Sequence, residues 1–552
     1  MQETLEAFIR ARLLTTNQIS GKTTIEVSHE ALIREWKRLA EWLREARDDI
    51  LFQQSLSEDS AEWEQRKRPR DRLYRGVQLK EAQAWARRNR PSEQEVAFLR
   101  ASTARRILSL VSIIVVVLLL VSSMGIAGWY VFLQPKPTLV TTLQDNVVGS
   151  LRWCIDNAPS GSTIRFAQGM RGIIELTGGD LVFPGGKQFT IAGPRANQLT
   201  ISGGNIDAHI HVSKGATLNI SDLSFKNSET VIYAFLFNQG SLTVTNSIIS
   251  GNKTTAGVTS FGGGIENRGT LTVINSTFSN NSSFGDLEGE GGGIFNEGKL
   301  TVTHSTFSNN SAISSKKDGL GGGINNTSTG TITVTDSIFS ENKAIGKQGG
   351  AGGGIDNSGK LTVIHSTFSN NSASSSDVTG FGGGIYNYRT GTLMVTDNTF
   401  SGNSASGKQD GQGGGIDNEG KLTVTHSIFS DNKAIGSGDN GFGGGIYNFR
   451  TGTLMVTNST FSGNSASGKQ DSQGGGINNF GELTVTTSTF SHNSASSSSS
   501  FGGGILSLGK GSSAIIRFCT IYGNTSSTGG GIWIDPTGSS HMTMSSSVIA
   551  AN

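Results

Sequence analysis

The chain has 552 residues and a formal net charge of +2, with 16% charged residues, 76 glycines and 8 prolines. This near-neutral charge and the lack of a base-reading motif argue against a nucleic-acid-binding protein. The two cysteines, Cys154 and Cys519, exclude a disulfide framework and a zinc-binding spacing, and we predict neither a metal site nor a cofactor. Only Gly21 and Gly76 precede residue 107, so a charged, helix-forming segment comes before a glycine-rich body.

Residues 1–102 are predicted to form a small, mostly helical domain. Leu13–Thr15 and Thr24–Ser28 flank a turn at Ser20-Gly21, which predicts the two strands of a wing. Ser28 is expected to cap a helix. The apolar residues of that helix recur at i, i+4, i+7 and i+11, as Leu32, Trp36, Leu39 and Leu43.

Several segments of this domain resemble the C-terminal part of a bacterial STAND-type NTPase module. The matching segments are ARLLTT, TIEVSHEALIREWKRLAEWL and LYRGVQLKEAQAW, at Ala11–Thr16, Thr24–Leu43 and Leu73–Trp85. In that family a histidine in the His-Glu-Ala-Leu segment is thought to reach bound ADP, which implies a nucleotide role for His29. A histidine with satisfied hydrogen bonds at a helix start is the alternative.

No phosphate loop accompanies this resemblance. Gly21-Lys22-Thr23 resembles the end of such a loop, but Thr16 stands where the motif needs glycine. A nucleotide role therefore requires a separate NTPase protein or an upstream segment. In one interpretation of the chain, a separate NTPase protein is its partner.

A membrane-spanning helix is predicted at Ile107–Leu133, because this stretch carries no charge and about 20 apolar residues span a bilayer. Ser92 and Glu95 have the spacing of a capping box at the start of the helix that leads to it. Six arginines precede the span: Arg87, Arg88, Arg90, Arg100, Arg105 and Arg106. Only Lys136 follows it closely, so the positive-inside rule predicts a cytoplasmic N-terminus and an extracytoplasmic C-terminal part.

A linker, residues 134–147, is expected to lead to an N-terminal cap and irregular coils in residues 148–259, with a short amphipathic helix at Gly149–Ile155. Residues 260–552 then repeat one short unit. Its Gly-Gly-Gly-Ile motif recurs at nearly even steps, ending at Ile265, Ile294, Ile324, Ile355, Ile385, Ile416, Ile446, Ile477, Ile505 and Ile532. A repeat with such a steady period predicts a solenoid.

Each unit offers three short β-type pieces, Gly-Ile-x-Asn, Leu-Thr-Val-Thr and Ser-Thr-Phe-Ser, which predict three strands per coil. Stacked coils would place like residues on like, with a ladder of isoleucines and one of asparagines that follow them by two positions. An aromatic stack is also expected, formed by Phe278, Phe307, Phe339, Phe368, Phe400, Phe429, Phe461 and Phe490. The segments between the strands, such as Ser282–Glu290, Ala344–Gly350 and Ser406–Gln412, are predicted to be polar loops.

These repeats resemble the right-handed parallel β-helix of the pectate-lyase-like superfamily, in the GGGI-x-N…STFS-x-N form of bacterial surface and polymorphic outer-membrane-type proteins. The resemblance covers residues 138–552 and implies an all-β solenoid. It implies no one activity, because this fold carries enzymes, adhesins and structural spikes.

Candidate site residues lie in the stripe between Ile and Asn of each unit, which we expect on an outer, solvated face. Asp356 and Asp417 are the candidate catalytic carboxylates, because two coils would separate them by about 9–10 Å, near the spacing of inverting glycosidases. Aromatic and basic residues nearby are candidates for contact with a sugar chain: Tyr386, Tyr447, Arg389, Arg450 and Trp533. The alternative is a repeat-copied solvated surface in which no coil differs from the rest.

The sequence thus favours a non-catalytic, membrane-anchored protein displayed at the cell surface, which serves adhesion, glycan contact or structural display. Its expected partners are the lipid bilayer and extracellular glycans or other surface polymers. One alternative is an extracellular polysaccharide lyase or hydrolase. The other is a signalling component whose N-terminal domain pairs with a separate NTPase.

Overall fold

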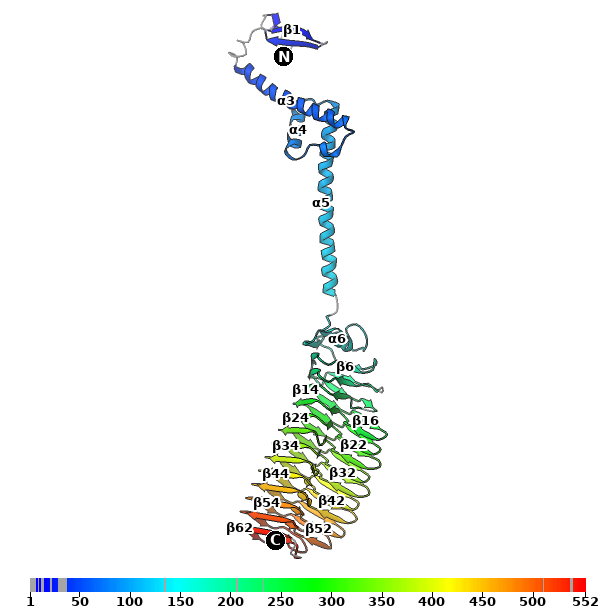
Figure 1. The fold of residues 1–552 in the computed structure, drawn as a ribbon, viewed down its shortest axis with the longest axis vertical. Coiled ribbons are helices and arrows are strands. Elements are labelled where there is room, and N and C mark those ends of the chain that lie inside the picture. Colours follow the sequence, from blue (N-terminus) through cyan, green and yellow to red (C-terminus); the bar gives the residue numbers. More distant parts are fainter. Residues whose placement is uncertain are drawn as a thin grey trace. The chain divides into compact units, whose positions relative to one another are not determined.

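The computed structural model describes residues 6–7, 9–10, 14–19, 22–27, 37–133, 136–204, 207–231, 233–509, 511–536 and 540–552. The chain divides into two compact units, Met1–Gln134 and Pro135–Asn552. Figure 1 labels their elements.

The first unit begins with a hairpin and continues as helices. Strands β1 (Leu14–Ile19) and β2 (Lys22–Val27) pair antiparallel, which confirms the two predicted strands of the hairpin. The elements that follow are α3 (Lys37–Gln65), the 3-10 turn η1 (Arg70–Arg72), α4 (Gly76–Arg88) and α5 (Glu93–Leu133). The predicted cap at Ser28, the first part of its helix and His29 lie outside the described residues.

The helices of this unit share a small aromatic core. Trp63, Tyr74 and Phe98 pack edge to face, with ring centroids 4.9–5.4 Å apart. Leu56, Leu79 and Trp85 complete the cluster. The predicted capping box starts α5: the Ser92 N–H donates to Glu95 Oε2 at 2.7 Å, and the Glu95 N–H donates to Ser92 Oγ at 3.3 Å.

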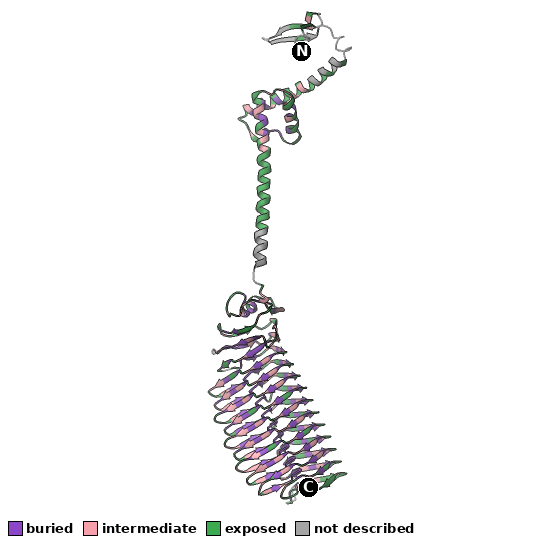
Figure 2. Cartoon of the chain, turned by 180° about the vertical axis from the view of Figure 1, so that it is seen from behind, coloured by how far each residue is buried: buried purple, intermediate pink, exposed green. Residues whose placement is uncertain are grey.

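Helix α5 is long and apolar enough to cross a membrane. Within Glu93–Met124 an 18-residue window has a mean hydropathy of 2.9, and none of that window is buried against the protein. In the cartoon of Figure 2, the apolar part of this helix is coloured as exposed. Burial inside a protein core therefore does not explain its apolar composition.

The second unit is a large parallel β-solenoid, as the sequence predicts. Its first element after β3 (Leu139–Val140) is the short helix α6 (Leu151–Asn157), where Ser150 Oγ accepts from the Trp153 N–H at 3.1 Å. Leu151, Cys154 and Ile155 from this segment join the core of the coils, so α6 covers part of the first coil.

Five parallel sheets, not three, run along the solenoid, with 15, 14, 13, 10 and 9 strands. One full coil shows all of them: β28 (Ile324–Asn326), β29 (Thr331–Thr335), β30 (Ile338–Ser340), β31 (Lys343–Gly346) and β32 (Gly349–Ala351). We name each sheet after its strands: β28 belongs to the Ile sheet, β29 to the Leu-Val sheet, β30 to the Phe sheet, β31 to the Ala sheet and β32 to the cover sheet.

The sheets begin and end at different coils. The Leu-Val sheet runs from β3 to β62 (His541–Ser545), and the Phe sheet runs from β5 (Gly172–Glu175) to β63 (Val548–Ala550). The Ile sheet runs from β6 (Leu181–Phe183) to β61 (Ile532–Ile534). The Ala sheet spans β12 (Glu229–Thr230) to β56 (Ser494–Ser496), and the cover sheet spans β17 (Thr259–Phe261) to β57 (Ser499–Phe501).

The prediction of polar loops between the three strands was wrong. Ser282–Glu290, for example, contains β21 (Ser282–Gly285) and β22 (Glu288–Glu290), which belong to the Ala and cover sheets. The middle residue of a cover strand is usually glycine, and a Cβ on Gly319 would lie 2.4 Å from the Ile345 carbonyl oxygen. Backbone therefore packs on backbone, and such packing leaves no hydrophobic pattern in the sequence.

The predicted ladders are confirmed. Consecutive rings from Phe278 to Phe490 stack with centroids 4.6–4.8 Å apart and planes within 8°. From Asn238 to Asn479 each amide nitrogen donates to the next asparagine at 2.7–2.8 Å. A second ladder, from Asn252 to Asn552, was missed: its amides donate to the next asparagine at 2.8–3.1 Å.

Candidate functional site

The stripe of candidate residues is buried, so the prediction of a solvated outer face was wrong. Asp356 is 5% exposed and Asp417 is 1% exposed, and Tyr386 and Tyr447 are also buried. The reason is the cover sheet, whose side chains contact the stripe. The rings of Phe381 and Tyr386 are 5.5 Å apart, and those of Phe501 and the half-buried Trp533 are 4.9 Å apart.

The register of the Ile sheet fixes the order of the candidate residues. Asp356 pairs with Tyr386, which pairs with Asp417, and Asp417 pairs with Tyr447. The two candidate carboxylates therefore lie two strands apart with a tyrosine between them. Asp417 does not line the pocket that Asp356 lines, so the structure does not bring the two acids to one cavity.

Burial gives the acids of the stripe unusual protonation behaviour. One Asp356 oxygen and both Asp417 oxygens are buried without a hydrogen-bond partner. Burial raises the pKa of Asp356 to about 8, with a further contribution from the Asp318 carboxyl. Burial also raises the pKa of Asp417 well above its ordinary range, and Glu419 adds to this shift. The Asp356 side chain is thus expected to be protonated at neutral pH.

A pocket of about 300 Å³ opens over Asp356. It is lined by residues of neighbouring coils: Asp318, Leu320, Gly349, Ala351, Asp356, Ser358, Phe381, Tyr386 and Tyr388. Gly349 and Ala351 come from β32, and a Cβ on Gly349 would lie 2.8 Å from Asp318 Oδ1 and 3.5 Å from the Phe381 ring. The small residues of this one cover strand therefore leave the space open.

The expectation that no coil differs from the rest is corrected by this pocket. The sequence GFGGGIYNYRTGTLMVT at 380–396 recurs at 441–457 as GFGGGIYNFRTGTLMVT. In the preceding coil, however, three small residues of the pocket have larger counterparts in the copy. Gly349, Ala351 and Ser358 correspond to Asp410, Gln412 and Glu419. This difference is visible in the sequence, but it has meaning only once the cover sheet is known.

The predicted basic residues lie at the surface beside the stripe. Arg389 is exposed and its Nε donates to Glu419 Oε2 at 2.8 Å. Tyr386 Oη donates to the other oxygen of Glu419 at 2.9 Å, so Glu419 holds both side chains. Arg450 is exposed as well, but Phe480 stands at the position that corresponds to Glu419.

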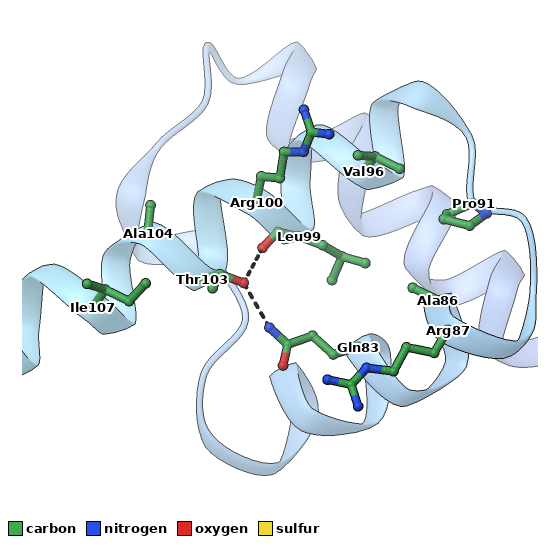
Figure 3. A pocket seen from close by; sticks show the side chains of 10 residues that line it. All are labelled: Gln83, Ala86, Arg87, Pro91, Val96, Leu99, Arg100, Thr103, Ala104 and Ile107. Atoms are coloured by element: carbon green, nitrogen blue, oxygen red, sulfur yellow. Dashed lines mark hydrogen bonds between the residues drawn. The ribbon is translucent and has the colours of Figure 1, made fainter.

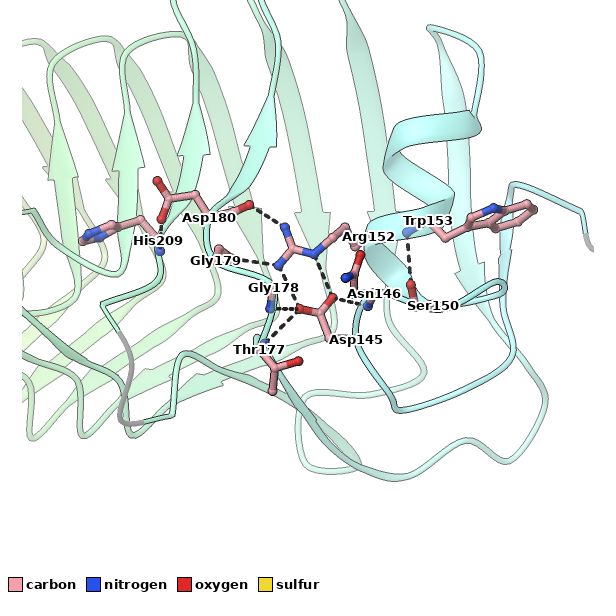
Figure 4. A network of polar contacts seen from close by, with 10 residues as sticks. All are labelled: Asp145, Asn146, Ser150, Arg152, Trp153, Thr177, Gly178, Gly179, Asp180 and His209. Atoms are coloured by element: carbon pink, nitrogen blue, oxygen red, sulfur yellow. Dashed lines mark hydrogen bonds and ion pairs between the residues drawn. The ribbon is translucent and has the colours of Figure 1, made fainter.

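Two further polar features lie outside the stripe. Between α4 and α5 a pocket of about 630 Å³ has an apolar floor and Arg87 and Arg100 among its lining residues (Figure 3). Gln83 donates to Thr103 across it at 2.8 Å. At the start of the solenoid, Arg152 binds Asp145 at 2.8 Å, and Asp145 accepts from the Thr177 and Gly178 N–H groups at 2.9 and 3.0 Å (Figure 4). This second network ties α6 to the first coils.

Among the described residues, no group of three or more histidine, cysteine, aspartate or glutamate side chains is arranged to hold a metal ion. Asp286, in the segment Ser282–Glu290, forms an ion pair with Lys316 at 2.8 Å. Both cysteines are buried free thiols.

Comparison with known proteins supports both resemblances. Residues 1–71 match the family Novel STAND NTPase 1, and residues 275–297 and 365–388 match the Chlamydia polymorphic membrane protein repeat. No curated protein matches the chain.

Two solved structures are similar to the chain, each at 11% identity with a TM-score of 0.35. One is the A-module of the mannuronan C-5 epimerase AlgE6 of Azotobacter vinelandii; the match covers 73% of this chain and 95% of that one. The other is a mannuronic-acid-specific polysaccharide family 6 lyase from human gut microbiota; the match covers 72% of this chain and 87% of that one.

Proposed function

We propose that this protein is a single-pass membrane protein that displays its β-solenoid outside the cytoplasm and binds a surface polymer, such as a glycan, at the pocket over Asp356. One observation carries the proposal: a single cover strand with small residues opens a pocket onto aromatic and carboxyl side chains that are otherwise buried. A volume of about 300 Å³ lies at the lower end of ligand pockets, which suits one residue of a chain.

The pocket has the chemistry for contact with a polymer. Phe381, Tyr386 and Tyr388 offer ring surface, and Tyr388 is 41% exposed at the opening. Asp318 and Asp356 offer oxygens for hydrogen bonds. Aromatic surface beside a few polar groups is typical of small-ligand sites.

A binding array tests this function. The full chain in phosphatidylglycerol nanodiscs should bind one class of surface polysaccharide, and Ala351→Gln should abolish binding because it inserts the residue that the copy has at this position. Gln473→Ala, in the same column four coils away, is the matched control and should bind as the unmodified chain does. Binding that survives Ala351→Gln contradicts the proposed site.

Degradation of the bound polysaccharide in the same assay would favour the lyase or hydrolase reading instead. The proton that the raised pKa of Asp356 retains at neutral pH is the feature that favours this alternative. The non-catalytic reading predicts that the polymer is recovered at its original length.

The orientation of the chain follows from its charge. Arginines gather before the apolar stretch of α5 and only Lys136 follows it closely, so we place the N-terminal unit in the cytoplasm. Ser376→Cys, on the solenoid surface, should react with a membrane-impermeant maleimide in intact cells, whereas Lys80→Cys should not. The native cysteines are buried, which keeps the background low. The opposite labelling pattern overturns this orientation.

The N-terminal unit suggests a coupling to signalling. Its match to the STAND NTPase family favours a role in which it pairs with a separate NTPase protein. Co-purification of the full chain with an ATP-binding protein, lost when residues 1–71 are deleted, would support this role; co-purification that survives the deletion would contradict it.

A further inference from the structure

The pocket over Asp356 has carboxyl groups and aromatic rings but no basic side chain among its lining residues. Its two acids come from different coils, Asp318 from β27 (Asp318–Leu320) and Asp356 from β33 (Ile355–Asn357). Glu290, one coil before Asp318, adds a third carboxyl that interacts with Asp356. None of these side chains offers an anionic sugar a positive charge to pair with.

The Asp356 side chain indicates which kind of group the pocket would bind. It is 5% exposed, lines the pocket, and has one buried oxygen without a hydrogen-bond partner. A buried carboxyl oxygen without a partner costs free energy, which a bound donor or cation would recover. The matched residue of the copy, Asp417, lacks partners for both oxygens but lines no part of this pocket.

The rings supply the second half of a cation site. Phe381, Tyr386 and Tyr388 all line the pocket, and the ring of Tyr386 lies 5.5 Å from that of Phe381 and 6.0 Å from that of Tyr388. The faces of aromatic rings attract ammonium groups, most strongly where water is excluded. Rings together with carboxyl groups, and no competing lysine or arginine, are the arrangement that selects an organic cation over a neutral group.

We propose that the pocket formed by Asp318, Asp356, Phe381, Tyr386 and Tyr388 binds an organic ammonium group carried on the surface polymer. This inference rests on the proposed function and names the group that is recognised. Two sources share this chemistry: the free amine of an amino sugar and a quaternary ammonium substituent. They differ in that only the first can donate a hydrogen bond to the free oxygen of Asp356.

Protonation should be coupled to binding. The titratable groups that face Asp356 are Asp318 on β27, Glu290 on β22 and Tyr386 on β38 (Ile385–Asn387). The pKa of Asp356 is raised to about 8, so a cation that binds below this pH favours release of the proton. Affinity should therefore rise with pH, by at most about tenfold per unit, and level off above about pH 8.

Choline tests the inference, with 3,3-dimethyl-1-butanol as a neutral molecule of the same shape. With the full chain in phosphatidylglycerol nanodiscs, which contain no choline headgroup, calorimetry should show choline binding at least about tenfold tighter than the alcohol. Asp356→Asn should weaken choline binding at least about tenfold and reduce its pH dependence, to which Asp318 and Glu290 still contribute. Asp417→Asn, a buried acid outside the pocket, is the matched control for folding and should change neither.

Glucosamine represents the free amine of an amino sugar, and choline represents a quaternary ammonium substituent. N-acetylglucosamine, which carries no free amine, is the neutral control for glucosamine. Tighter binding of glucosamine than of choline assigns an amino sugar, and the reverse assigns a quaternary ammonium substituent. The inference is overturned if choline binds no more tightly than the alcohol and glucosamine binds no more tightly than N-acetylglucosamine. If the polymer still binds and Ala351→Gln still blocks it, the proposed function survives that result.

Discussion

Two regions of the solenoid, 380–396 and 441–457, have almost the same sequence and different surroundings. Tyr386 follows a coil with Gly349 and Ala351, whereas Tyr447 follows one with Asp410 and Gln412. The first region borders an open pocket, and we expect the larger side chains of the second to fill the equivalent space. A duplicated sequence therefore does not imply a duplicated site, because the neighbouring coil decides what is accessible.

The core beneath both regions should respond equally to mutation, with the largest effects. Phe368 and Phe429 are equivalent, fully buried members of the same stack. Phe368→Ala and Phe429→Ala should each lower the free energy of unfolding by about 3–5 kcal/mol, because each leaves a cavity and breaks two ring contacts. Urea unfolding followed by circular dichroism measures this loss. Values that differ by more than about 1 kcal/mol would show that the two cores are not equivalent.

The pH dependence of stability should also be shared by the two regions. The pKa of Asp356 is raised in the folded protein, so between about pH 4 and pH 8 the folded state holds a proton that the unfolded chain has released. Stability from this residue therefore falls as pH rises through that window. Asp356→Asn should reduce the loss of stability between pH 5 and pH 9 by roughly a few kcal/mol. Asp417→Asn should change the profile in the same direction, because the pKa of Asp417 is also raised. An unchanged pH profile would mean that the acids are solvated.

Substitutions in the second asparagine ladder should have a smaller effect on stability, which is again the same in the two regions. The Asn371 amide donates to the Phe339 carbonyl and to Asn403, each at 2.9 Å. The equivalent residue in the second region, Asn432, donates to the Phe400 carbonyl and to Asn464 at 2.8–2.9 Å. Replacement of either residue by alanine should cost about 1–3 kcal/mol, because it leaves buried backbone groups unpaired. Thermal unfolding measures this cost, and a neutral substitution would indicate that water replaces the amide.

The smallest expected effect separates the two regions. Arg389 pairs with Glu419, whereas the position that matches Glu419 near Arg450 is Phe480. Arg389→Ala should cost at most about 1 kcal/mol, because the Arg389 side chain is 58% exposed, and Arg450→Ala should cost close to nothing. Unfolding midpoints of the two variants make the comparison. A larger loss of stability for Arg450→Ala than for Arg389→Ala would contradict the stabilising role of the pair between Arg389 and Glu419.

Much of the fold could be predicted because like residues stack on like. The isoleucines, the phenylalanines and the first set of asparagines each recur at the same position of the repeat. The structure stacks each set into a ladder, as expected. The Ala and cover sheets could not be predicted, because Ala312 and Gly319 pack by close backbone approach and leave no hydrophobic signal. The error about the site followed from this omission.

Of the candidate site residues, Asp356 and Tyr386 line the pocket, and the sequence did not show the surroundings of either. The sequence pointed to Asp356 and Tyr386 as neighbours on adjacent coils, and the register agrees. It could not show that Glu419 holds Tyr386 and Arg389, nor that Ala351 opens the space above Asp356, because both depend on contacts between coils.

A reciprocal exchange between the two regions tests the central claim most directly. Calorimetry with the shortest bound polymer fragment would count sites per chain in the unmodified protein, in Ala351→Gln, and in a variant that combines Asp410→Gly, Gln412→Ala and Glu419→Ser. The structure predicts one site, none and two sites, respectively. Retained binding in Ala351→Gln, or a count that does not change in the opened copy, would show that small residues in the cover strand do not create the site.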